Sequence, residues 1–305
     1  MATKTKHSKG RPVSRPPASQ RPPVWAYLAV GAGIVVLGVA IIALMNRGGG
    51  SQSSSAGLPN TPDYHSLLVE PGNSDTLLLG THVGVYRSTD AGRHWRLFKL
   101  ANRDAMNLAR AGNGKTIWMA GHDVFARSDD GGTTWEELQP ASLPSLDIHG
   151  FAVDPREPRT VYAAVAGRGL YRSVDRAATF TLVSRDVGGA VMALAVTPSG
   201  ALLAGDMARG LLRSRNNGRT WTGALNAQLA GLAISPSDPK LILATGPGVL
   251  RSADGGRTWK RVLEVQSGAG PVAWSASRPS RAYVVGFDRT LYRSDDAGLT
   301  WKPAE

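Results

Sequence analysis

The sequence VYRSTDAGRHW at residues 85–95 is the best guide to the fold, because close variants of it recur five times in the chain. The other copies are FARSDDGGTTW (125–135), YRSVDRAATF (171–180), LRSRNNGRTW (212–221), LRSADGGRTW (250–259) and YRSDDAGLTW (292–301). Their serines are separated by 40, 45, 41, 38 and 42 residues. A repeat of this length is typical of the four-stranded blade of a β-propeller.

Each copy has the chemistry of a tight turn between two strands. The serine is followed by an aspartate, whose carboxylate accepts hydrogen bonds from the turn, and by a glycine that tolerates unusual backbone angles. The aromatic residue starts the next strand and is large enough to pack between sheets. We therefore interpret these residues as structural: Ser88, Asp90, Trp95; Ser128, Asp130, Trp135; Ser173, Asp175, Phe180; Ser214, Asn216, Trp221; Ser252, Asp254, Trp259; Ser294, Asp296, Trp301. Ala177 replaces the glycine and Asn216 replaces the aspartate, so we expect looser turns there.

The sequence between the copies of the motif predicts short strands. Each repeat opens with an apolar run bounded by Pro, Gly or Asp, as in HSLLVEP (65–71) and HGFAVDP (149–155). One arginine precedes each serine, which favours a structural role between blades or on a sheet face. We predict an all-β, six-bladed propeller over residues 58–305. The last outer strand is very short, and residues 58–64 are expected to complete that sheet and close the ring.

The repeated motif S-x-D-x-G-x-T-W resembles the Asp-box, or BNR repeat. It is similar to the repeats of sialidases, xyloglucanase-type glycoside hydrolases, the sortilin ectodomain and the photosystem II stability/assembly factor propellers. The resemblance covers residues 64–305 and implies the propeller fold. The resemblance is compatible with two functions, a binding or assembly module and a glycoside hydrolase, because one fold serves many functions.

The N-terminal part of the chain predicts a membrane anchor. The apolar stretch from Trp25 to Met45 has no charge and, at about 1.5 Å per residue, would span the core of a bilayer. We predict a basic, Pro-rich cytoplasmic tail (1–24), a transmembrane helix (25–46), a Gly/Ser linker (47–57) and an extracytoplasmic propeller, following the positive-inside rule. A cleaved signal peptide is the alternative, which the length of the apolar stretch disfavours.

Composition excludes several functions. The chain has no cysteine, so disulfides, thiolate metal sites and a Cys nucleophile are ruled out. The formal net charge is +12, but residues 1–50 hold seven basic and no acidic side chains. The remainder has 28 basic against 23 acidic residues and no basic run with interleaved aromatics, which argues against nucleic-acid binding.

Histidines and arginines form the candidate binding set. We expect His65 and His149 to begin innermost strands, and His82 and His122 to lie in turns between second and third strands, all on one face in one sector. Converging imidazoles suit a transition metal or a protein partner, whereas hydrogen bonding around the mouth of the central channel is the purely structural alternative. Arg168, Arg209 and Arg289 add positive charge to the same face, which suits an acidic partner or an anionic glycan. We assign these seven residues to ligand binding, with no metal ligand and no cofactor.

The hydrolase alternative depends on carboxylates. A glycosidase needs two that face each other across a sugar-sized gap. The candidates on the same face are Asp123, Asp147, Asp206 and Asp288, and Asp123, Asp206 and Asp288 are expected in turns between second and third strands. Because a turn role explains these aspartates equally well, we expect a non-catalytic, membrane-anchored module that binds a protein or glycan, with glycoside hydrolysis as the alternative.

Overall fold

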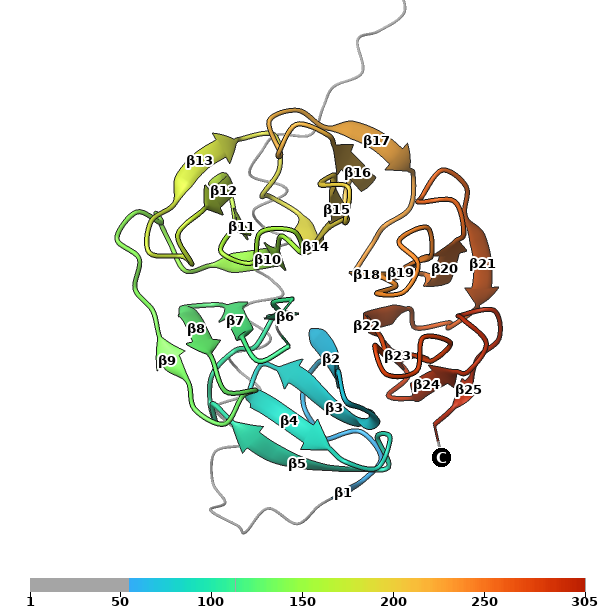
Figure 1. Ribbon diagram of the computed structural model, residues 1–305. Helices are drawn as coiled ribbons and strands as arrows, with labels where there is room; N and C mark the ends of the chain where they lie inside the picture. Colours follow the sequence, from blue (N-terminus) through green and yellow to red (C-terminus); the bar gives the residue numbers. More distant parts are fainter. Residues whose placement is uncertain (1–54, 113, 305) are drawn as a thin grey trace, which may run out of the picture. The chain divides into compact units, whose positions relative to one another are not determined.

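The computed structural model describes residues 55–112 and 114–304, which belong to the compact unit Gln52–Glu305. Within these ranges every regular element is a β-strand, and the strands form six antiparallel sheets arranged around a central axis (Figure 1). The prediction of an all-β, six-bladed propeller is therefore confirmed. The predicted transmembrane helix (25–46) lies outside the described residues, and no helix within them is long and apolar enough to cross a membrane.

Each blade uses four consecutive strands, ordered from the central axis outward. Blade one contains β2 (Ser66–Glu70), β3 (Asn73–Thr81), β4 (Gly84–Ser88) and β5 (His94–Lys99), with β1 (Ser55–Ala56) at its outer edge. Blade two contains β6 (Asn107–Arg110), β7 (Ile117–Gly121), β8 (Val124–Ser128) and β9 (Glu136–Glu137). Blade three contains β10 (Ile148–Val153), β11 (Val161–Val165), β12 (Gly169–Ser173) and β13 (Thr181–Ser184).

The second half of the ring repeats this plan. Blade four contains β14 (Val191–Val196), β15 (Leu202–Asp206), β16 (Gly210–Ser214) and β17 (Thr222–Leu225). Blade five contains β18 (Gly231–Ile234), β19 (Ile242–Gly246), β20 (Gly248–Ser252) and β21 (Lys260–Leu263). Blade six contains β22 (Ala269–Trp274), β23 (Ala282–Gly286), β24 (Leu291–Ser294) and β25 (Lys302–Pro303).

The hydrophobic core lies between neighbouring sheets. Second strands such as β7 and β11 are buried along their whole length, because sheets cover both of their faces, whereas outer strands such as β9 are exposed. The six innermost strands line a mostly apolar cavity of about 380 Å³ along the axis. In blades four and five the repeated arginine connects neighbouring blades: the guanidinium of Arg213 donates to the carbonyl of Gly255, and Arg251 donates to the carbonyl of Ala297 at 2.8 Å.

The six Asp-box turns share one hydrogen-bonding pattern. In blade two, the Ser128 hydroxyl donates to Asp130 at 2.8 Å and accepts the N–H of Gly132 at 2.8 Å. The two divergent turns are not looser, which corrects the expectation from sequence. The N–H of Ala177 lies 2.9 Å from the Ser173 hydroxyl, and Ala177 adopts a φ of 67° to keep this bond, a conformation that costs a non-glycine residue roughly 1–2 kcal/mol. Asn216 accepts from its serine at 2.9 Å, as the aspartates do.

The aromatic residues of the six repeats differ in how far they are buried. Trp95 and Phe180 are buried, whereas the tryptophans of the other four copies are half-buried. The indole of Trp95 also donates to the carbonyl of Gly92 at 2.8 Å, so it braces its own turn as well as the core.

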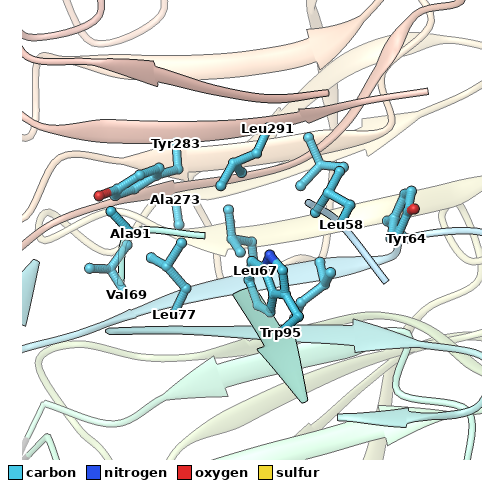
Figure 2. Close-up of a cluster of buried hydrophobic side chains, with 12 residues drawn as sticks. Leu58, Tyr64, Leu67, Val69, Leu77, Ala91, Trp95, Ala273, Tyr283 and Leu291 are labelled. Atoms are coloured by element: carbon cyan, nitrogen blue, oxygen red, sulfur yellow. The ribbon is translucent and has the colours of Figure 1, made fainter. Parts of the chain in front are cut away.

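Within the described residues no strand is exchanged between blade six and blade one, and side-chain packing joins the two blades. The prediction that residues 58–64 complete the last sheet is wrong, because blade six has its own outer strand β25, while β1, within the predicted linker, pairs with β5 of blade one. Leu58 and Tyr64 instead insert their side chains between the two blades, beside Trp95, Tyr283 and Leu291 (Figure 2).

Candidate functional site

One face of the propeller, called here the upper face, carries the segments that lead into the innermost strands and the turns between second and third strands. The Asp-box turns lie at the opposite ends of the strands, because neighbouring strands run antiparallel. The four candidate histidines all belong to upper-face segments of blades one to three: His65, His82, His122 and His149.

In blade one, two imidazoles and a carboxylate form a hydrogen-bonded group. His65 Nε2 lies 2.7 Å from His82 Nδ1, and their ring centroids are 4.3 Å apart. Asp63 Oδ1 lies 2.6 Å from His82 Nδ1 and 3.1 Å from His65 Nε2. Burial would raise the pKa of Asp63, but its contacts with the two histidines hold that pKa well below the usual range.

The group continues across blades two and three. His122 Nδ1 hydrogen-bonds to Asp104 Oδ2, and its Nε2 lies 3.2 Å from His149 Nε2. Asp147 Oδ1 lies 2.9 Å from His149 Nε2 and 3.4 Å from His122 Nε2. The ring of His82 stacks on that of His122 with centroids 6.0 Å apart, which joins the two halves. We call the seven residues Asp63, His65, His82, Asp104, His122, Asp147 and His149 the His/Asp arc.

The carboxylates favour protonated imidazoles in the arc. The hydrogen bond to Asp104 is the largest influence on His122 and raises its pKa, helped by the charges of Asp104 and Asp147 and opposed by burial. Burial acts to lower the pKa of His82, but the hydrogen bond to Asp63 and the charges of Asp104 and Asp63 outweigh it. These two imidazoles therefore stay protonated to a higher pH than isolated histidines do.

Local backbone features position these side chains. Gly121 directly precedes His122 in the chain, and a Cβ at Gly121 would lie only 1.9 Å from the carbonyl oxygen of Asp104. A glycine is therefore needed at this position for the two backbones to approach closely enough for Asp104 to contact His122. Strand β10 shifts register between Ile148 and Gly150, which makes His149 the extra residue of a β-bulge. Bulges of this kind re-aim a side chain at a sheet end.

Asn107 of blade two secures the bulge from the neighbouring blade. Its amide donates to the carbonyl of Ile148 at 3.1 Å and accepts the N–H of Phe151 at 3.2 Å. These bonds fix the backbone on both sides of His149.

The three candidate arginines occupy upper-face turns but differ in their bonding. Arg209 pairs with Asp206 at 2.9 Å in its own turn. Arg289 donates to Asn60 at 2.9 Å and so ties the start of the propeller to blade six. Arg168 is exposed, and its guanidinium bonds to none of the residues that the structure describes.

The carboxylates of the hydrolase alternative are held within turns. Asp206 is buried and accepts from Arg209 and from the N–H of Ala208. Asp288 accepts the N–H of Thr290 at 3.0 Å and the hydroxyl of Tyr292 at 2.6 Å. Asp123 is exposed in a turn with a φ of 53°.

The upper face also carries two exposed apolar side chains, Met207 and Phe287. A Cβ at Gly270 would lie 2.8 Å from the Phe287 ring and 3.5 Å from the carbonyl oxygen of Tyr64. Phe287 therefore lies close to the segment that carries His65.

A second hollow, of about 470 Å³, lies on the Asp-box face between blades four and five. Its charged lining residues are Arg213, Arg215, Lys240, Asp254 and Arg257. Burial, followed by the charges of Arg215 and Arg257, lowers the pKa of Arg213. In blades two and six the residue after the Asp-box serine is an aspartate, whereas Arg215 occupies this position in blade four. The hollow is consequently cationic.

Comparisons with known proteins identify the family. Residues 68–303 match the family described as Photosynthesis system II assembly factor YCF48, which is well over half of the chain. The chain belongs to this family. No curated protein matches it.

Solved structures share the fold of this YCF48-family chain at low identity. The structure "YCF48 bound to D1 peptide" is 18% identical, with a TM-score of 0.51 over 83% of this chain and 84% of that one. YCF48 from Cyanidioschyzon merolae is 17% identical, with a TM-score of 0.52 over 83% and 88% of the two chains. The GH74 xyloglucanase from Xanthomonas campestris is 18% identical, with a TM-score of 0.58 over 83% of this chain. This chain covers 46% of the xyloglucanase, just under half of that protein.

Sequence reasoning missed part of the arc of this YCF48-family propeller. Asp63 and Asp104 were not candidates, although each comes shortly before an innermost strand, as Asp147 does. The signal was an Asp-x-His pattern in DYH (63–65) and DIH (147–149), with DAM (104–106) at the same place in blade two. Phe287 and Met207 were also missed, because exposure of a single apolar residue has no sequence signature.

Proposed function

We propose that this YCF48-family propeller is a non-catalytic module that binds a segment of a protein partner on its upper face. The observation that carries the proposal is the combination on that face of the His/Asp arc, the exposed guanidinium of Arg168 and the exposed side chains of Phe287 and Met207. Charged groups beside apolar anchors suit a peptide segment, since the apolar groups supply affinity and the charges fix its register. The YCF48 structure with a bound D1 peptide supports a protein ligand by analogy of fold.

We further propose that residues 25–46 anchor the chain in a membrane, with the propeller on the extracytoplasmic side. The support is the charge-free stretch from Trp25 to Met45 and the excess of basic residues before it. Tethering raises the local concentration of the propeller near membrane partners, which suits an assembly role.

The bonding of the candidate carboxylates favours binding over glycoside hydrolysis. Asp206 is used by Arg209 and Asp288 by Tyr292, so two of the three acids are committed to contacts within their own turns. A hydrolase would instead present a matched acid and base to one sugar bond.

Photo-crosslinking tests the proposed binding face. A photoreactive phenylalanine analogue is placed at Phe287 or Met207 in the full-length chain, and in cells of the source organism we expect discrete crosslinked protein adducts. Val174 and Leu299 are matched controls, because they are exposed apolar residues in Asp-box turns of the opposite face. Adducts from Val174 or Leu299 alone, or adducts from none of the four positions, would contradict the proposal.

A further inference from the structure

Three potential metal ligands meet at the boundary between blades two and three. His122 Nε2 and His149 Nε2 are 3.2 Å apart, and Asp147 Oδ1 lies 2.9 Å from the second nitrogen and 3.4 Å from the first. The three atoms form a compact triangle with two nitrogens and one oxygen. The histidines come from neighbouring blades, so the packing of blade two against blade three brings these donors together.

The spacing of the three atoms fits a coordinated ion. Zn–N and Zn–O bonds are about 2.0–2.1 Å long, which places neighbouring ligand atoms of a tetrahedral site about 3.3 Å apart. The edges of the triangle, 3.2, 2.9 and 3.4 Å, lie close to that value. Two imidazoles and a carboxylate are also a donor set that divalent transition metals prefer.

Asp147 Oδ1 is the unusual atom of the group. It is buried, and His149 Nε2 approaches it at 2.9 Å. A buried carboxylate oxygen is costly without a positively charged partner, and a bound cation supplies one when both imidazoles are neutral.

Asp104 supplies the outer contact that metal-binding histidines usually make. Because His122 Nδ1 hydrogen-bonds to Asp104, the Nδ1 of a neutral imidazole carries the proton and the lone pair of Nε2 points to the other two donors. The Gly121 backbone and the β-bulge at His149 hold the two rings in these positions, so the site is built before any ion arrives.

The group in blade one has a different spacing. Asp63 Oδ1, His65 Nε2 and His82 Nδ1 are separated by 2.6, 2.7 and 3.1 Å. The two shorter distances are well below the separation of about 3.3 Å between neighbouring ligand atoms of a tetrahedral site, so an ion would have to push these atoms apart. This group therefore serves as an internal comparison.

We propose that His122, Asp147 and His149 bind one divalent transition-metal ion, with Zn²⁺ as the best match, on the upper face of the propeller. The side chains are between 21% and 41% exposed, so solvent reaches the site and water completes the coordination. The inference does not rest on the proposed protein partner, because the ion is held by residues of this chain alone.

The test is a metal titration of the full-length chain, purified in detergent without a polyhistidine tag and stripped with EDTA. We expect one Zn²⁺ per chain by calorimetry and by elemental analysis after dialysis. Co²⁺ is expected to give the intense visible bands of a tetrahedral site, which Zn²⁺ then abolishes. This second readout needs only the unaltered protein. Absence of stoichiometric binding by the unaltered chain would overturn the proposal.

Variants locate the ion. His149→Ala and His122→Ala should abolish the Co²⁺ bands, and Asp104→Asn should weaken Zn²⁺ affinity about 10–100-fold, as loss of an outer carboxylate does. His94→Ala is the matched control, because the His94 side chain is exposed and pairs with Asp90 of its own turn on the opposite face. Circular dichroism checks that each variant is folded. If His65→Ala abolishes binding while His149→Ala does not, the ion binds in blade one and the proposal is wrong.

Discussion

Arg281 in the last blade and Asp75 in the first form an ion pair of 2.6 Å, although 206 residues separate them in the chain. The buried guanidinium also contacts Asp295 at 2.7 Å and the Ser74 hydroxyl at 3.2 Å. Tyr283 adds a hydrogen bond to the carbonyl of Ser74 at 3.0 Å. Since the strands of residues 55–112 and 114–304 include none exchanged between these blades, such side-chain contacts hold the ring closed there.

Replacing Arg281 therefore tests ring closure. We expect Arg281→Ala to lower the free energy of unfolding by about 1.5–3 kcal/mol, the range for hydrogen bonds to charged groups. Urea unfolding followed by tryptophan fluorescence measures it. Arg278→Ala, at an exposed arginine in the same blade, should change stability by less than about 0.5 kcal/mol. Equal effects of the two changes would show that closure does not depend on Arg281.

Trp95 should be the most costly of the repeated tryptophans to remove. It is 2% exposed and packs where the first and last blades meet. Trp95→Ala is expected to destabilise the protein by about 3–5 kcal/mol, because it leaves a large cavity. Trp301→Ala, at a half-buried copy, should cost clearly less in the same unfolding assay. The reverse order of the two losses would contradict this difference in burial.

The Asp-box turns predict a loss of stability in acid. The pKa of Asp130 is lowered from 3.8 to about 2, chiefly by the N–H of Thr134 and then by its hydroxyl, and Asp175 and Asp296 have similar values. Because the folded-state pKa lies below the unfolded one, the stabilisation is complete above about pH 4 and disappears as the pH falls towards 2. Unfolding curves measured from pH 5 to pH 2 check this.

A variant isolates one of these carboxylates. Asn216 already makes the same serine and backbone contacts in blade four, at 2.9 and 3.0 Å. Asp130→Asn should therefore fold at neutral pH and show a shallower dependence of stability on pH below 4. An unchanged acid dependence would mean that Asp130 is not among the groups responsible.

Gly121 should not tolerate a side chain. An added Cβ would meet the Asp104 carbonyl oxygen at 1.9 Å, and backbone cannot yield as a flexible side chain does. We expect Gly121→Ala to cost about 1–3 kcal/mol of stability, as overpacking does. Gly72→Ala is the control, since nothing lies within 4 Å of that position. Thermal unfolding of both variants decides the point, and equal melting temperatures would refute the clash.

The topology proposal is testable because the chain contains no cysteine. A single cysteine at Val174, which is exposed on the propeller, should react with a membrane-impermeant maleimide in intact cells or spheroplasts. A cysteine at Ser8, in the proposed cytoplasmic tail, should react only after lysis. Labelling of Ser8→Cys without lysis, or protection of Val174→Cys, would reverse or exclude the proposed orientation.

The propeller fold can be predicted from the sequence. Six copies of a short turn motif at a nearly constant period specify six equivalent sheets, because each turn is stabilised by bonds within about five residues of its own serine. Hydrogen bonds within a turn can be predicted from the sequence without knowing which residues pack against that turn. The positions of the four histidines at one end of their strands followed from the same periodicity.

Tertiary structure alone decided how the ring closes and what the histidines contact. Leu58 and Tyr64 pack their side chains between blade one and blade six. This arrangement depends on the fit between Leu58 and a blade that lies more than 200 residues away in the chain. Likewise, Asp104 becomes the partner of His122 only because Gly121 lets two backbones approach, and His149 is turned towards His122 by a one-residue bulge. Such contacts join different blades. The repeat period predicts the strand to which a residue belongs, but it does not predict the distances between side chains of neighbouring sheets.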